Sequence, residues 1–195
     1  MISKNELRNF ILEGIDVPES EYSHMLDMSE LFRDCKGLTS IPYIETKNVL
    51  DMGGMFRGCI LLESIPKLDT SKVTNMYGMF QDCEKLHTIP RLNTENVNFM
   101  DYMFRGCKSL ISIPHLKTSK VTSMSWMFFV CNQFDMNLAG WDVSNVTNAG
   151  AMFGNNIAHP SFFLLNWKPG VLDESGEFST LKRQSLRLGE LSDFL

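Results

Sequence analysis

The sequence predicts a solenoid, a stack of about five similar coils of 24 residues with short parallel strands, short helices and a helical cap at each end. Four residue types recur at a constant interval of 24. Intervals of this size are typical of solenoids, in which each unit packs only against its neighbours. The recurring residues are Met28, Met52, Met76, Met100 and Met124; Phe32, Phe56, Phe80, Phe104 and Phe128; Cys35, Cys59, Cys83, Cys107 and Cys131; and Pro42, Pro66, Pro90 and Pro114.

Within one coil, the apolar residues are separated mostly by three positions. The M-x-x-M-F segment has roughly helical spacing, so we expect a short helix or a 3₁₀ turn there. The L-x-x-I-P segment ends in proline, which disfavours the α region for the preceding residue, so we expect a short extended strand there. A unit of one strand, a connection and one short helix is an α/β repeat of the leucine-rich type.

The two ends of the chain depart from the repeat. We expect residues 1–24 to form an N-terminal cap, because Ser3 and Glu6 have the spacing of a capping box and Gly14 stands where such a helix would end. We expect residues 25–154 to form the solenoid and residues 155–195 to form a C-terminal cap with an amphipathic helix. In the alternative interpretation, these ends are partner-binding arms, and the C-terminal helix joins two copies as a homodimer.

Composition argues against several classes of protein. The 23 acidic and 18 basic residues give a net charge of −5, which disfavours a nucleic-acid partner and a polybasic membrane-surface protein. No apolar run approaches the ~20 residues of a membrane span, and the first residues, MISKNELRNFILEG, show no signal-peptide pattern. Five Cys at one repeat position do not suggest a disulfide framework. We therefore expect a cytoplasmic protein with reduced thiols and no membrane partner.

No residue pattern indicates catalysis, a metal or a cofactor. Zinc sites need clustered Cys and His spacings, and these cysteines are 24 residues apart. The four His occupy different repeat positions, and no nucleophile elbow, phosphate loop or metalloprotease motif occurs. We expect a protein that is not an enzyme and has no cofactor. We also expect Cys59, Cys83 and Cys107 to be buried, reduced and metal-free, because free Cys is among the most buried residue types.

Three segments carry a resemblance to a known family. The stretch GWDVSNVTNAGAMF and the units DTSKVTNMYGMFQDC and KTSKVTSMSWMFFVC resemble the BspA-like leucine-rich repeat family of bacterial surface proteins. The resemblance covers about residues 25–154. It implies a leucine-rich solenoid that works by binding proteins or surfaces. Many members of that family are secreted or lipid-anchored, whereas this sequence shows no export signal.

The columns that vary between coils predict the binding surface. Tyr, Trp and Arg dominate binding hot spots, and exposed variable positions form the recognition face of a solenoid. The alternative is a solvated face in which Lys and Arg stems cover the coil edges. Threonines at a constant position, Thr46, Thr70, Thr94 and Thr118, are expected to form hydrogen-bonding ladders. The predicted partner-binding residues are Tyr43, Lys67, Arg91 and His115 after the prolines; Arg33, Arg57 and Arg105 after the phenylalanines; and Tyr102 and Trp126 in a third column.

These observations favour a non-enzymatic protein–protein interaction module of bacterial or phage origin, an adaptor or an inhibitor that occludes a partner's site. The basic and aromatic stripe predicts an acidic partner protein. Two other functions stay open from the sequence. One is an adhesive surface protein, which the family resemblance implies, and the other is a nucleic-acid binder that uses the basic stripe.

Overall fold

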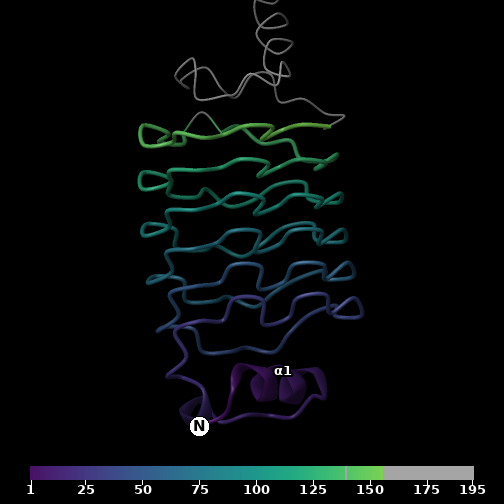
Figure 1. Ribbon diagram of the computed structural model, residues 1–195. Coiled ribbons are helices and arrows are strands. Elements are labelled where there is room, and N and C mark those ends of the chain that lie inside the picture. Colours follow the sequence, from purple (N-terminus) through teal and green to yellow (C-terminus); the bar gives the residue numbers. More distant parts are fainter. Residues whose placement is uncertain (139, 156–195) are drawn as a thin grey trace, which may run out of the picture.

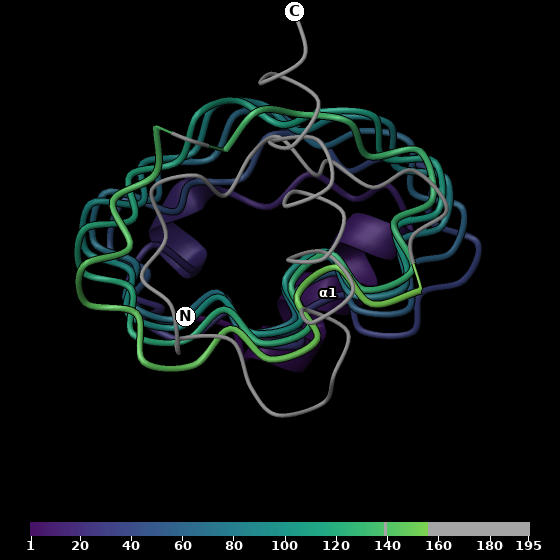
Figure 2. The ribbon, with the colours of Figure 1, turned by 90° about the horizontal axis from the view of Figure 1, so that it is seen from above.

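The structure, a computed structural model, describes residues 1–138 and 140–155. The 24-residue units follow one another as coils of a single stack, with the helix α1 (Lys4–Leu12) at the N-terminal end (Figure 1). Seen along the stack, successive coils superpose on one flattened ring (Figure 2). In the described part of the chain, regular helix is limited to α1 and the 3₁₀ helix η1 (Glu19–Glu21). The predicted stack of 24-residue repeats is confirmed.

The predicted strands at the L-x-x-I-P segments are wrong. These segments contribute scattered backbone hydrogen bonds between coils, such as that from the Glu63 N–H to the Thr39 carbonyl at 2.9 Å. Proline ends each segment without an N–H group, so a ladder cannot continue through it. Parallel pairing instead lies one residue before the Met column, as isolated bridges along the series Asp27, Asp51, Asn75, Phe99, Ser123 and Asn148.

The predicted helices at the M-x-x-M-F segments are also wrong, whereas the alternative expectation of a 3₁₀-type turn is closer to the structure. In the second coil the Met55, Arg57 and Cys59 N–H groups each donate to the carbonyl three residues earlier, at 2.9–3.2 Å, and not four residues earlier as in an α-helix. Gly54 and Gly58 interrupt any helix, because their φ angles are +61° and +73°. A spacing of three fits a run of tight turns as well as a helix, which is why the apolar pattern alone was ambiguous.

This run of turns also builds the contact between coils. The amides that do not close a turn donate to the next coil, for example from Met52 to the Asn75 carbonyl at 3.1 Å and from Phe56 to the Met79 carbonyl at 2.9 Å. The Gly53 N–H is bound by the Asp51 side chain at 2.7 Å. Every N–H from 52 to 59 therefore has a partner. Buried backbone groups must be paired, so this pattern can replace a regular sheet.

The core is a column of stacked phenylalanine rings. Neighbouring ring centroids from Phe32 to Phe128 lie 5.5–5.6 Å apart, with interplanar angles of 4–13°. Beside them, the thiol of each later coil donates to the Phe carbonyl of the coil before, as from Cys83 Sγ to the Phe56 carbonyl at 3.1 Å. The same bond is made by Cys59, Cys107 and Cys131. All five Cys are free thiols, and the predicted burial of Cys59, Cys83 and Cys107 is confirmed.

Burial should make four of the five thiols inert. It raises the pKa of Cys59 and of Cys131 to about 12. It also raises the pKa of Cys83 and of Cys107 well above the usual value of a thiol. Cys35 is half-buried. We expect a maleimide at pH 8 to label one thiol, Cys35, in native protein and five in denaturant, as counted by mass spectrometry. Fast native labelling of two or more thiols would contradict this burial.

The same thiols should make stability depend on pH. Unfolded thiols ionise with a pKa of about 8.5, well below the raised values in the fold. The free energy of unfolding contributed by the neutral thiols is thus fully present below that pH and declines as the pH rises toward 12.

Helix α1 closes the N-terminal end of the stack. The expected capping box is confirmed, since the Ser3 and Glu6 side chains each accept the other's backbone N–H. Gly14, with φ +74°, follows the last turn, and its N–H donates to the Ile11 carbonyl at 3.1 Å. Lys4 Nζ donates to the Ser29 carbonyl at 2.9 Å, and Arg8 Nη2 donates to the Arg33 carbonyl at 3.1 Å.

Lys4 and Arg8 supply the hydrogen-bond donors that a preceding coil would otherwise supply. The matching carbonyls of the second coil, at Gly53 and Arg57, accept N–H groups from the first coil. The first coil has no coil before it, so its carbonyls take side-chain donors from α1 instead.

The last described coil departs from the period. Phe128 and Phe153 are 25 residues apart, yet their rings still stack at 5.6 Å. Phe134 adds a ring 4.2 Å from Phe128. Thr118 is buried, and its hydroxyl has no hydrogen-bond partner among the described residues, unlike the hydroxyls of Thr46, Thr70 and Thr94. Residues 156–195, where we expect the C-terminal cap and amphipathic helix, lie outside the described residues.

Candidate partner-binding surfaces

The residues that follow the prolines line one groove along the stack, which we call the post-proline groove. Its volume is about 620 Å³. The repeat register brings the four predicted residues together there, and all four are exposed: Tyr43, Lys67, Arg91 and His115. The rest of its lining is Leu68, Asp69, Thr70, Ser71, Leu92, Asn93, Glu95 and Lys117.

The coil fixes the direction of these side chains. Ile65 and Leu68 are buried, and Lys67 between them is exposed. A buried threonine then ties the coil to the next one. The Thr70 hydroxyl donates to the Asn93 carbonyl at 2.8 Å and accepts the Asn93 N–H at 2.8 Å. The predicted threonine ladder is confirmed for Thr46, Thr70 and Thr94.

Lys67 and Arg91 are the two basic residues of the groove that the described residues do not hold in an ion pair. Within residues 1–138 and 140–155, neither side chain forms an ion pair or a hydrogen bond. The two carboxylates of the lining are already engaged. Asp69 accepts the Ser71 N–H at 2.9 Å, and hydrogen bonds from Ser71 lower the pKa of Asp69. Glu95 Oε1 lies 3.9 Å from Lys117 Nζ.

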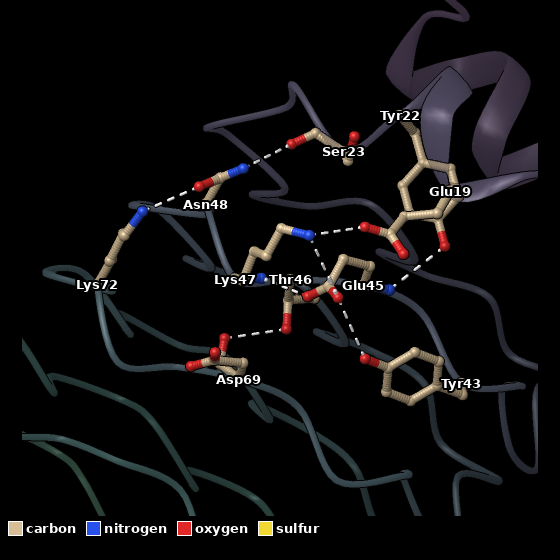
Figure 3. A network of polar contacts seen from close by, with 10 residues as sticks. All are labelled: Glu19, Tyr22, Ser23, Tyr43, Glu45, Thr46, Lys47, Asn48, Asp69 and Lys72. Atoms are coloured by element: carbon tan, nitrogen blue, oxygen red, sulfur yellow. Dashed lines mark hydrogen bonds and ion pairs between the residues drawn. The ribbon is translucent and has the colours of Figure 1, made fainter.

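The N-terminal end of the groove is fixed by polar contacts (Figure 3). Tyr43 is 65% exposed, and its hydroxyl lies 3.5 Å from Glu45 Oε2. Glu45 is held by the Lys47 N–H at 2.8 Å and donates its own N–H to the Tyr22 hydroxyl at 3.3 Å. Lys47 Nζ reaches Glu19 at 2.8 Å, and this bond raises the pKa of Lys47. The tyrosine is therefore presented by an ordered edge.

The arginine column behaves differently from coil to coil. Arg33 is paired with Glu30 at 2.6 Å and with Asp34 at 3.4 Å. Arg57 and Arg105 stand at the same position of later coils, but the described residues offer them no ion pair. Both line a pocket of about 290 Å³ together with Tyr77, Gln81, Tyr102 and Trp126, which we call the aromatic–arginine pocket. Arg33 is not part of this pocket. Of the three predicted arginines, the structure therefore brings together Arg57 and Arg105 only.

Aromatic rings form the other wall of this pocket. The Tyr77 and Tyr102 ring centroids lie 5.3 Å apart, and Tyr102 stacks on Trp126 at 6.1 Å with an interplanar angle of 8°. Phe129 lies 4.4 Å from Trp126, and the Arg105 guanidinium carbon is 5.7 Å from the Phe129 ring. Four aromatic side chains and one arginine therefore form a continuous contact chain.

The comparisons with known proteins identify the repeat. The sequence profile of the family described as "Mycoplasma protein of unknown function, DUF285" matches residues 25–113 and, in a second overlapping copy, residues 87–168. The chain belongs to the DUF285 family. No curated protein and no solved structure matches it. The Phe and Cys columns of these DUF285 repeats are also consistent with BspA-like repeats. Neither helix in the described part of the DUF285 chain has the length and hydrophobicity that spanning a membrane requires.

Two features of the DUF285 coils were not predicted from the sequence. Tyr77 was not among the predicted residues, although it completes the aromatic wall. The loss of ion-pair partners around Arg57 and Arg105 was also missed. The signal was present in the sequence. The carboxylates at positions 30 and 34 become Gly54 and Gly58 around Arg57.

Proposed function

We propose that the chain is a non-enzymatic protein-interaction module, an adaptor or an inhibitor, that binds an acidic partner in the post-proline groove. The observation that carries the proposal is the pair Lys67 and Arg91, which lie on consecutive coils in one groove and form no ion pair or hydrogen bond among the described residues. The chain as a whole is acidic, with a net charge of −5. A pair of free cations on such a surface selects an anionic partner by complementarity.

The proposed mechanism is rigid display. The coils hold the backbone of Lys67 and Arg91 at a fixed spacing, so little backbone conformational entropy is lost on binding. Carboxylates of the partner would accept charge-assisted hydrogen bonds from both side chains, and Arg91 offers the bidentate geometry that suits a carboxylate. Tyr43, held at the end of the groove, adds contact area at low entropy cost.

Charge reversal of this pair tests the proposal. Peptides selected from a random display library on wild-type protein are expected to be enriched in Asp and Glu. The variant Lys67→Glu/Arg91→Glu should bind them at least tenfold more weakly, a loss of about 1.4 kcal/mol, with Kd measured by calorimetry. Its melting temperature should stay close to that of wild type, because both side chains are exposed.

The matched control is Lys36→Glu/Lys85→Glu, which changes the charge equally at two exposed lysines outside the groove. This control should keep wild-type affinity. If the control weakens binding equally, the loss of affinity is caused by the change in net charge and not by the post-proline groove. A folded Lys67→Glu/Arg91→Glu variant with wild-type affinity would overturn the proposal.

The resemblance to BspA-like repeats favours a second candidate, an adhesive protein of the bacterial cell surface built on a leucine-rich-type solenoid. The five free thiols support the first candidate instead, because free thiols are the rule in the reducing cytoplasm. Fractionation of the native host with an antibody separates the two. Recovery in the soluble cytoplasmic fraction supports the adaptor or inhibitor, and recovery at the cell surface supports the adhesin.

A further inference from the structure

The coils that form the aromatic–arginine pocket lack the two carboxylates that pair with the arginine in the first coil. Around Arg33, carboxylates stand three residues before and one residue after the arginine. Around Arg57 both positions are glycine. Around Arg105 they are Tyr102 and Gly106. The cation is thus kept in two coils without an ion-pair partner in its own coil. The Asp34 and Asp82 carboxylates of the preceding coils lie beside Gly58 and Gly106, but no ion pair joins them to Arg57 or Arg105 among the described residues.

The pocket has an excess of hydrogen-bond donors. Two guanidinium groups line it, and among its described lining residues none carries a carboxylate. The Arg105 Nε atom is buried and has no hydrogen-bond partner. Gln81 turns one amide N–H away, toward Asp82 Oδ2 at 3.2 Å. A buried donor without a partner costs free energy, so a ligand rich in acceptors would recover it.

Two of the aromatic residues stand at a turn position whose backbone is left-handed in every described coil. Tyr102 and Trp126 have φ angles of +60° and +59°, in the left-handed region. The same position is Glu30, Gly54, Gly78 and Ala151 in the other coils, also with positive φ. The conformation therefore belongs to the repeat, and it places the side chains of Tyr102 and Trp126 one above the other in the same column.

We propose that the aromatic–arginine pocket binds a peptide segment of a partner protein in which a carboxylate lies within a residue or two of an aromatic ring. The carboxylate pairs with Arg57 and Arg105, and the ring packs on Tyr77, Tyr102 and Trp126. The planar guanidinium group of arginine can donate two parallel hydrogen bonds to a carboxylate. Paired aromatic rings stabilise a contact beyond the effect of the area that they bury. A volume of about 290 Å³ can hold side chains of this kind. This site goes beyond the post-proline groove and does not depend on it.

Synthetic peptides of twelve residues with a central Glu-Tyr-Glu, read by fluorescence polarisation on the full chain, test this site. We expect saturable binding to wild type. Replacement of both Glu by Gln, or of Tyr by Ala, should weaken it at least tenfold. Arg57→Ala and Arg105→Ala should each weaken it at least fivefold. Because Arg105 packs on Phe129, Arg105→Lys serves as a second variant that keeps the stem and charge but loses the fork.

Two control variants show whether the affinity depends on this pocket in particular. Arg33→Ala removes an arginine of the same column that already has partners, and it should leave the affinity unchanged. Lys67→Glu/Arg91→Glu should also leave it unchanged, so failure of the proposed function and failure of this site are distinguishable. The inference would be overturned by the absence of saturable binding, by a Tyr→Ala peptide that binds as well as the parent, or by an equal loss of affinity with Arg33→Ala. It would also be overturned if the only peptide that binds is one with phosphorylated Tyr and both Glu replaced by Gln.

Discussion

Replacement of Phe80 by alanine is expected to lower the free energy of unfolding by about 3–5 kcal/mol, which is comparable to the whole stability of many domains. Phe80 is fully buried, and its ring lies between those of Phe56 and Phe104, 5.6 Å from each. The alanine would leave a cavity that interrupts the ring column at its centre. Because each coil packs only on its neighbours, one cavity weakens two coil interfaces at once. Urea denaturation followed by circular dichroism measures the loss.

The chain offers a matched control for this change. Phe99 belongs to the neighbouring coil but is 48% exposed, so Phe99→Ala should change stability by no more than about 0.5 kcal/mol. Phe80→Leu, which fills part of the cavity, should fall between the two. If Phe80→Ala and Phe99→Ala lower stability equally, the ring column does not carry the stability of the stack.

Much of the architecture could be predicted from the sequence because stacking acts on identical positions. A residue type repeated every 24 positions must meet its own kind in the next coil, so the Phe and Cys columns were predictable. The local backbone was not. Apolar residues three apart suit both a helix and a run of tight turns, and only the left-handed residues distinguish them. Asp34, Tyr102 and Trp126 hold that conformation without being glycine, so residue type carries no sign of it there.

The candidate site shows the same division. The post-proline residues share one groove because the 24-residue register alone places them side by side. The arginine column, by contrast, depends on neighbours within each coil, and these change from Glu30 and Asp34 to glycine. A column read only by residue type treats Arg33 and Arg57 as equivalent. Their electrostatic surroundings make the first a paired surface residue and the second a free cation.

Replacement of Gly58 by alanine is expected to lower the free energy of unfolding by about 2–3 kcal/mol, for two separable reasons. Gly58 has a φ of +73°, and the left-handed region costs an alanine about 1–2 kcal/mol. A Cβ at this position would also overlap the Asp34 carboxylate of the preceding coil. Gly106 meets Asp82 in the same way two coils later, so Gly106→Ala should behave alike. Thermal and urea unfolding measure both changes.

Two other glycines and one compensating change separate these reasons. Gly37 has open space around its Cα and no positive φ, so Gly37→Ala should be neutral or slightly stabilising. Gly14 has open space but a φ of +74°, so Gly14→Ala should show the backbone cost alone. Asp34→Ala removes the carboxylate and keeps a non-glycine residue at this position of positive φ, so Gly58→Ala made in the Asp34→Ala background should cost no more than Gly14→Ala does. If Gly58→Ala costs no more than Gly14→Ala, the aspartate carboxylate moves aside freely, and the Asp–Gly alternation between coils is not a packing constraint.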